Sequence, residues 1–267
     1  MNFNSLQYLV FLVANVVVYY LLPQRARNVQ LLLASYYFYM CWNPAYALLM
    51  LFSTAVTYGC GLMVGNAVWG KRRLWVALSL LLNLGVLFFF KYYNFAAGLL
   101  SDAVHAAGLG LDVPLLDVLL PVGISFYTFQ TISYVVDVYR GDARAQPNPV
   151  YYLLYLSMYH QLVAGPVVRY ADVAREITTR TTDAVSFSEG LTRVCFGLAK
   201  KVLVANTAGS LADKFLLAPA SGLSVGGAWF GAAMFTLQIY YDFSGYSDMA
   251  IGLGRMFGFH YKENFNY

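Results

Sequence analysis

The sequence predicts an all-α, polytopic membrane protein, and three observations support this fold class. Of its 267 residues, 60% are hydrophobic and only 11% are charged, whereas roughly a quarter of the positions are charged in a soluble domain. The longest uncharged run, residues 28–70, holds 43 residues, about twice the ~20 that one helix needs to cross the hydrocarbon core. Charges and turn residues separate apolar spans, without linkers between domains, so we expect residues 1–267 to form a single multipass unit.

The same composition excludes several other classes of protein. The three cysteines, Cys41, Cys60 and Cys195, lack C-x-x-C spacing, so they indicate neither a disulfide framework nor a zinc site. We expect them to be small apolar packing residues, and we expect no metal and no bound cofactor. The net charge of +4 comes from short basic clusters beside apolar runs. This pattern sets membrane topology and differs from the single basic stripe of a nucleic-acid footprint, so we expect no nucleic-acid partner.

The first part of the chain predicts an anchor and a hairpin. Residues 1–24 carry no charge and precede two arginines, so we predict a retained membrane anchor whose amino terminus faces outward. The long uncharged run should divide at Asn43-Pro44, because proline removes a backbone donor and restricts the residue before it. The basic residues 71–73 should close the resulting hairpin on the inner side.

Two further crossings should follow this hairpin. Residues 74–90 are apolar, and we expect them to lead outward into a loop that carries Asp102, His105 and Asp112. Residues 117–136 should then return inward toward the next arginines, because Lys and Arg tend to remain on the cytoplasmic side.

Residues 145–168 break this alternation. They are uncharged but precede Arg169, Arg175 and Arg180, which a full crossing would place on the outer side. A segment that enters the membrane, breaks at the Gly-Pro step at 165–166 and returns would keep these arginines inside. Irregular backbone is tolerated at such depth where protein or a water-filled cavity satisfies its polar groups. We therefore expect a re-entrant segment with a cavity near its break.

The remaining spans are predicted from a cap and from small residues. Ser186 and Glu189 fit an S-x-x-E capping box that opens a helix at the inner interface, with Arg193 and Lys200 on one face. Residues 215–241 form a further uncharged span. Three small-x-x-x-small pairs predict close helix packing: Gly61 with Gly65, Gly227 with Gly231, and Gly254 with Gly258.

Polar side chains inside apolar runs are the first candidates for a functional site. Ser125 and Gln130 follow a Pro-Val-Gly step, and they either hydrogen-bond between helices or line a wet substrate path; composition favours the structural role. His160 and Gln161 immediately precede the Gly-Pro break. A histidine there can act as a base or proton relay, or it can be a neutral residue that is hydrogen-bonded between helices.

Two carboxylates stand at the end of the last apolar span. Asp242 and Asp248 lie beside Tyr241 and Ser244, and a carboxylate within a membrane is costly unless it is partnered, so both are functional-site hypotheses. The alternative makes Asp242 the buried partner of a basic side chain such as Arg255. A helical spacing of six places the two carboxylates on different faces, so they need not act as a pair.

Five sequence blocks follow one another in the order of a known family. They are LPVGISFYTFQ at 120–130, QLVAGPVVR at 161–169, GLAKKV at 197–202, YDFSGYSD at 241–248 and ENFN at 263–266. In this order they resemble the successive blocks of the membrane-bound O-acyltransferases. More narrowly, they resemble the branch typified by the membrane subunit of the bacterial alginate O-acetyltransferase.

The resemblance implies tilted helices around a funnel and a tunnel, in the bacterial cytoplasmic membrane. A cytoplasmic acyl thioester would enter as the donor from one side, and the hydroxyls of an exported polysaccharide would enter from the other. Membrane lipid would surround the protein, and periplasmic acetyltransferases would be its partners. The family's essential histidine, thought to act as general base, lies in a motif after the ENFN block, and none of His105, His160 and His260 matches that motif.

We therefore expect this chain to be the amino-terminal portion of an O-acetyltransferase, inactive alone, with the catalytic histidine beyond Tyr267. Asp242 would support that histidine by orienting it and stabilising its protonated form. The candidate substrate path comprises the other polar and irregular positions: Ser125, Gln130, His160, Gln161, Gly165, Pro166, Tyr241, Ser244 and Asp248. Two alternatives stay open, a non-catalytic carrier that passes acyl groups to a periplasmic transferase and a transporter whose wet path uses Asp242.

Overall fold

A computed structural model describes residues 5–66, 69–108, 113–162, 165–166, 168–218 and 223–265. Within these ranges the structure is all-helical and contains no strand, as predicted. The chain divides into two compact units, and each is described by itself. Unit 1 comprises residues 1–34, 158–168 and 172–267, and unit 2 comprises residues 35–157 and 169–171.

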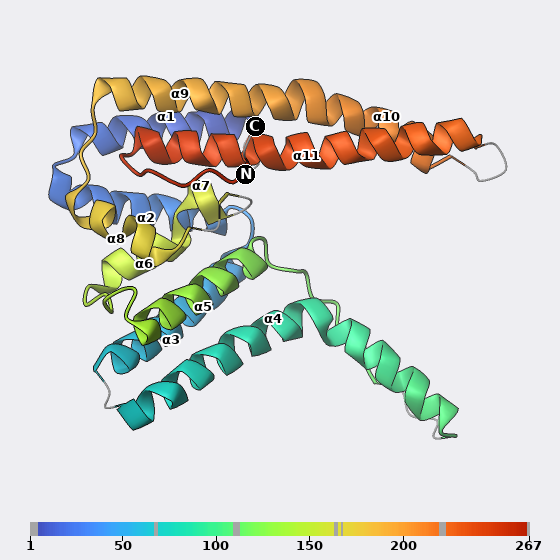
Figure 1. Cartoon of the computed structure of the whole chain (residues 1–267), viewed down its shortest axis with the longest axis horizontal. Helices are drawn as coiled ribbons and strands as arrows, with labels where there is room; N and C mark the ends of the chain where they lie inside the picture. Colours follow the sequence, from blue (N-terminus) through green and yellow to red (C-terminus); the bar gives the residue numbers. More distant parts are fainter. Residues whose placement is uncertain are drawn as a thin grey trace. The chain divides into compact units, whose positions relative to one another are not determined.

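Unit 1 is built around two long antiparallel helical segments. The first runs from α9 (Ala184–Ala199) through the π-helix η1 (Lys200–Ala205) into α10 (Asn206–Leu216), and it lies along α11 (Val225–Met256) for most of its length (Figure 1). The other helices of the unit are α1, the first part of α2, α7 and most of α8: Leu6–Leu21, Gln24–Met40, Tyr159–Leu162 and Tyr170–Thr179.

Unit 2 contains the end of α2 and four further helices. These are α3 (Pro44–Asn66), α4 (Trp69–Ala106), α5 (Ile124–Arg140) and α6 (Pro149–Ser157). The predicted break at Asn43-Pro44 is confirmed, because α2 ends at Met40 and α3 begins at the proline. Proline suits the first helical position, where its missing N–H has no intrahelical partner.

Two described helices are long and apolar enough to cross a membrane. They are α3 and the Lys71–Ala106 part of α4. Helix α4 leaves large apolar side chains exposed, with Leu81 at 71% and Phe95 at 67%, which suits a lipid environment. Helix α1 is apolar but only 16 residues long, shorter than the ~20 residues of a full crossing.

The loop predicted after residue 90 is wrong. Helix α4 continues to Ala106 and carries both Asp102 and His105, because a charged residue removes no backbone hydrogen bond and the segment has no proline to end it. Asp112 lies outside the described residues. The span predicted to start at residue 117 also starts later: α5 begins at Ile124, after Gly123 adopts a positive φ of 75°.

The start of α9 differs from the predicted capping box. The N-cap is Asp183, not Ser186, and its carboxylate accepts a hydrogen bond from the Ser186 N–H at 2.6 Å. That hydrogen bond holds the pKa of the Asp183 carboxyl below its usual value. The single span predicted over residues 215–241 is also wrong. Those residues contain the end of α10, and α11 begins only at Val225, after the cap residue Ser224.

The predicted break at Gly165-Pro166 is confirmed, because neither residue is helical; a second break, between α6 and α7, was not predicted. Helix α6 ends at Ser157, the short α7 ends at Leu162, and Gly165 and Pro166 are irregular. The re-entrant path itself remains a prediction.

Arg180, expected in a basic inner loop, is buried with 5% of its surface exposed. Its Nε donates to the Tyr19 hydroxyl and to the Phe257 carbonyl, both at 3.0 Å, and its Nη1 donates to the Asn28 side chain at 2.6 Å. The guanidinium also lies over the Phe259 ring at 4.5 Å. Arg180 thus ties α1, α2 and the turn after α11 to the end of α8.

Four glycines set the distance between α9 and α11. A methyl group on Gly190 would lie 2.6 Å from the Gly252 carbonyl oxygen, and one on Gly197 would lie 2.5 Å from the Gly245 carbonyl oxygen. No side chain fits between these backbones. We call the four residues the glycine seam. At least one glycine of each predicted pair is also closely packed, but against a side chain: Gly61 against Tyr134, Gly231 against Phe215 and Gly254 against Tyr261, which lies after the end of α11.

Gly197→Ala should lower the thermal stability of the protein in detergent, because the new methyl forces the two backbones apart. Overpacking of this kind costs about 1–3 kcal/mol. The matched control is Gly226→Ala, in the first turn of α11, where a methyl meets no atom within 4 Å and alanine is the better helix former. Thermal unfolding followed by circular dichroism should show a loss only for Gly197→Ala, and an equal loss in both variants would contradict the seam.

Candidate functional site

The glycine seam brings the charged side chains of α9, η1 and α11 into register. Arg255 Nη2 lies 2.6 Å from Glu189, and Arg193 Nη2 lies 2.9 Å from Asp248 Oδ1. Further along the same helix pair, Lys200 Nζ lies 2.6 Å from Asp248 Oδ2. Ion pairs and close glycine contacts therefore alternate along one antiparallel interface.

Asp248 is the centre of this arrangement. Its side chain is 8% exposed and binds two cations, with Arg193 donating to Oδ1 and Lys200 to Oδ2. Lys200 also donates to the Ser244 hydroxyl at 3.3 Å. Arg193 continues to Glu263, where Nη1 donates to Oε1 at 2.6 Å. The segment that follows α11 is thereby held against α9. We call Arg193, Lys200, Ser244, Asp248 and Glu263 the Asp248 cluster.

Asp242 has a different partner from the one considered in the sequence. It binds Lys201, and its side chain is 41% exposed, whereas Arg255 binds Glu189. The reason is geometric, since Asp242 and Arg255 lie on the same helix and are separated by about 20 Å along its axis. Asp242 and Asp248 bind separate cations, as the spacing of six predicted.

The π-helix explains how two consecutive lysines both reach α11. Lys200 and Lys201 are the first residues of η1, and they bind Asp248 and Asp242, respectively. A π-helix has a wider turn than an α-helix and occurs frequently at functional sites. Sequence analysis missed this feature.

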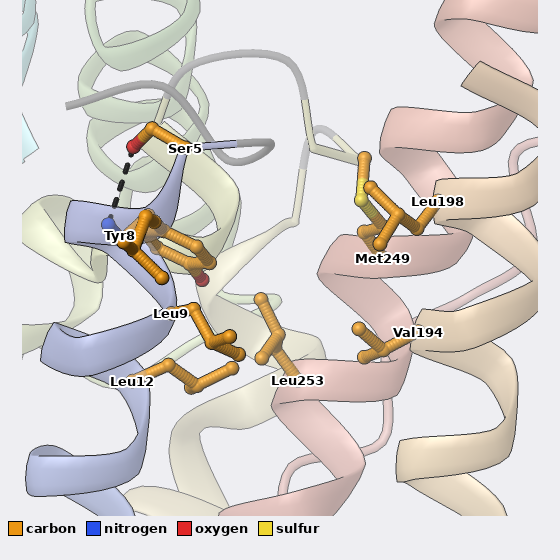
Figure 2. A pocket seen from close by; sticks show the side chains of 9 residues that line it. Ser5, Tyr8, Leu9, Leu12, Val194, Leu198, Met249 and Leu253 are labelled. Atoms are coloured by element: carbon orange, nitrogen blue, oxygen red, sulfur yellow. Dashed lines mark hydrogen bonds between the residues drawn. The ribbon is translucent and has the colours of Figure 1, made fainter. Parts of the chain in front are cut away.

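An apolar pocket of about 300 Å³ lies between α1, α9 and α11 (Figure 2). Val194 and Met249 line it, and they directly follow Arg193 and Asp248 in sequence, so the pocket and the Asp248 cluster share one helix pair. At the start of α1, the Ser5 hydroxyl accepts from the Tyr8 N–H (Figure 2). The remaining lining residues are apolar apart from the Tyr8 hydroxyl: Leu6, Tyr8, Leu9, Leu12, Leu198 and Leu253.

His160 and Gln161 lie in α7 and are each 2% exposed. His160 Nδ1 lies 3.2 Å from the Tyr261 hydroxyl. Its ring stacks on Phe257 with a centroid distance of 6.2 Å. Between the two alternatives predicted for His160, the geometry favours a histidine hydrogen-bonded between segments.

Gly165 is closely packed. A methyl there would lie 2.6 Å from the Gln161 Cα and 3.1 Å from the Ala250 Cβ, and Pro166 is buried beside it. The expected cavity near this break is not the apolar pocket of Figure 2, because neither Gly165 nor Pro166 lines that pocket.

The other predicted residues divide between the units. Tyr241 is half-buried on α11 with its ring against Tyr240, in unit 1 with Ser244 and Asp248. Ser125 and Gln130 lie on α5 in unit 2, half-buried and buried, respectively. Among the described residues, no three His, Cys, Asp or Glu side chains lie together as metal ligands would.

Unit 2 contains an ion pair that the sequence did not predict, between a buried aspartate and an arginine whose side chain is 49% exposed. Asp137, 1% exposed on α5, binds Arg169, whose Nε donates to Oδ2 at 3.2 Å. A buried hydrogen-bond network lies nearby in the same unit: Asn83 Nδ2 donates to the Thr57 hydroxyl at 2.9 Å, and the Thr131 hydroxyl donates to Asn83 Oδ1 at 3.3 Å. Such bonds hold membrane helices together.

Asp248→Asn and Asp242→Asn should differ strongly in their effect on stability. Removing the buried Asp248 charge leaves two cations beside a neutral amide, and breaking a buried pair costs about 3 kcal/mol. Asp242 is part-exposed, so its neutralisation should cost less than about 1 kcal/mol. Denaturant unfolding of both variants in the same detergent measures the difference, and equal losses would argue against Asp248 as the centre of the cluster.

Known proteins share this sequence over nearly its whole length. The probable alginate O-acetylase AlgI of Pseudomonas aeruginosa is 44% identical over 251 residues, covering 93% of this chain and 48% of that protein. The Azotobacter vinelandii protein of the same name is 44% identical over 253 residues, covering 93% and 50%. The peptidoglycan O-acetyltransferase of Helicobacter pylori is 31% identical over 281 residues, covering 93% and 52%.

The chain spans about half the length of the curated relatives it matches. No family model matches it. The identity to proteins named as O-acetylases nevertheless extends over 93% of the chain and agrees with the five ordered blocks. The chain therefore belongs to the membrane-bound O-acyltransferase family, in the branch that contains the bacterial alginate O-acetylases.

Proposed function

We propose that the chain takes part in membrane O-acetylation, in which an acetyl group passes from a cytoplasmic acyl thioester to hydroxyl groups of an exported polysaccharide. The observation that carries this proposal is the similarity over 93% of the chain to proteins named alginate O-acetylase and peptidoglycan O-acetyltransferase. Both names describe acetyl transfer to oxygen, on alginate in one case and on peptidoglycan in the other. The chain would act as a multipass protein of the bacterial cytoplasmic membrane, together with periplasmic acetyltransferases.

Acyl transfer from a thioester needs a base near the acceptor hydroxyl, a polarised carbonyl and a path that excludes water. We assign the Asp248 cluster a positioning role in this chemistry. Its ion pairs join α9, α11 and the segment that carries Glu263. Asp248 replaces Asp242 as the carboxylate of most interest, because it is buried and bound by two cations, whereas Asp242 is part-exposed.

The apolar pocket beside this cluster supports the exclusion of water. Its lining is aliphatic apart from Ser5 and the Tyr8 ring, and an apolar wall next to a charged cluster strengthens electrostatic interactions by lowering the local dielectric constant. We propose that the pocket shields the donor side of the reaction from water.

A direct test is complementation. Because we expect the chain alone to be inactive, the full reading frame that includes it is expressed in an alginate-producing bacterium that lacks its own alginate O-acetylase gene, and acetyl esters are measured on the purified polymer. We expect acetylation to return with this gene and not with a frameshifted copy. Polymer that stays unacetylated despite detectable protein in the membrane would contradict the proposal.

A second measurement separates an enzyme from a carrier. Washed membrane vesicles containing the product of that full reading frame receive a labelled acetyl thioester and purified polysaccharide, with or without the periplasmic fraction of the host. An O-acetyltransferase labels the polymer without that fraction. Label that reaches the polymer only when the fraction is present would favour a carrier that serves a periplasmic transferase.

His160→Phe, made in the full reading frame that includes this chain, should retain acetyl transfer to within about threefold per folded molecule, because His160 is buried in an aromatic cluster and is not assigned to catalysis. A general base contributes about 10²–10⁴ in rate, so its loss would be unmistakable. The matched control, Tyr261→Phe, removes the same hydrogen bond but keeps the imidazole. If only His160→Phe abolished transfer while both variants folded, His160 would be the base.

A further inference from the structure

Basic side chains gather at one end of the helices of unit 2. Arg72 Nε donates to the Val64 carbonyl at 2.8 Å, and its Nη2 donates to the Val138 carbonyl at 3.3 Å. Arg73 Nε donates to the Tyr139 hydroxyl at 3.4 Å. These bonds place the start of α4 beside the ends of both α3 and α5.

Two further segments of unit 2 meet at the same place. Arg169 binds Asp137 near the end of α5, and its Nη2 lies 3.7 Å from Asp142 Oδ2 in the following turn. A methyl on Gly65, in the last turn of α3, would lie 2.7 Å from the Ala145 Cβ, so the loop that includes Arg144 packs here as well. We call the six basic residues of this end the basic patch: Lys71, Arg72, Arg73, Arg140, Arg144 and Arg169.

The basic patch holds the net charge of the whole chain. It contains six of the 17 basic residues, and its neighbours Asp137 and Asp142 are two of the 13 acidic residues, so the remainder of the chain has as many acids as bases. All six side chains except Arg72 are exposed. Among the described residues, no carboxylate lies within ion-pair distance of Lys71, Arg140 or Arg144.

The basic patch also lies where the two candidate membrane spans meet. The first span ends at Asn66 and the second begins at Lys71, so the patch occupies the end of both helices, which is the level of the lipid headgroups when both helices cross the membrane. Tyr139 lies within it, with Arg72 over its ring at 5.9 Å, and tyrosine concentrates at membrane interfaces. Clusters of four to eight basic residues next to a span attract anionic lipids.

We propose that the basic patch binds the phosphate groups of anionic phospholipids in the inner leaflet. A soluble phosphorylated ligand is less suited to it, because the side chains are exposed on an open surface and none of the six lines either of the described pockets. The inference rests on unit 2 alone and is independent of acetyl transfer. The sequence pattern assigned these charges to setting membrane topology. The proposal adds that they also select anionic over zwitterionic lipids.

The test uses the protein in neutral detergent, equilibrated with equal amounts of phosphatidylglycerol and phosphatidylcholine, with the bound lipids counted by native mass spectrometry. We expect a clear preference for phosphatidylglycerol. The triple variant K71Q/R140Q/R144Q removes three exposed charges that make no described ion pair, and it should weaken this preference by on the order of 100-fold. The matched control R25Q/R175Q/K214Q removes three exposed charges elsewhere and should change it by less than about threefold.

Several results would overturn the proposal. One is an equal loss of preference in both triple variants, which would indicate a general effect of net charge. Another is full retention in the basic-patch variant. Coenzyme A, used as a soluble phosphate probe, should not displace phosphatidylglycerol; displacement that depends on the patch would assign it to a soluble ligand. If the patch variant loses helicity, the lipid preference of the unmodified protein is measured at 50 mM and at 500 mM salt instead. Phosphate binding by exposed cations requires a weaker preference at the higher concentration, so an unchanged preference would contradict the proposal.

Discussion

The contact between the backbones of α9 and α11 is the constraint on which the rest of unit 1 depends. At the glycine seam the two helices approach until a single methyl group would collide with a carbonyl oxygen. Gly197 lies seven positions after Gly190, and Gly252 lies seven positions after Gly245, so the contact repeats after two turns on each antiparallel helix. A repeat of this kind sets both distance and register, and small residues favour such packing in membranes because backbones attract each other at short range.

Register, in turn, decides which charges are paired. Between the two glycine contacts, Arg193 faces Asp248, and one turn beyond the seam the π-helix directs Lys200 and Lys201 to two carboxylates that face different ways. A buried carboxylate in an apolar unit is tolerated only with such partners. The same pairs extend through Glu263 to the segment after α11. The structure therefore couples close backbone packing, charge compensation and the placement of a family sequence block.

Unit 2 uses its polar residues differently. Its interior contains a neutral network around Asn83, and the buried carboxylate of Asp137 binds Arg169, whose side chain is exposed. Of the other basic residues at that end, Lys71, Arg73, Arg140 and Arg144 are exposed, whereas Arg72 is half-buried and donates to two backbone carbonyls. Buried polar groups thus hold the helices of this unit together. The exposed charges contribute little to the stability of the fold, so they are available to bind an external partner.

Composition and short motifs by themselves determined the all-helical class, the break at Asn43-Pro44, the break at Gly165-Pro166, and the family, because hydropathy, proline geometry and ordered sequence blocks are local properties. The ends of the helices were predicted less well from the sequence. Helix α4 continues past Asp102, where a loop was predicted, and the N-cap of α9 is Asp183 and not Ser186. Only the tertiary structure decided the partners of the two carboxylates, since Asp248 and Arg193 are 55 residues apart. Pairing across such a distance depends on the glycine seam. The seven-residue spacing of its glycines predicts a contact only once α9 and α11 are known to be antiparallel neighbours, which the sequence does not reveal.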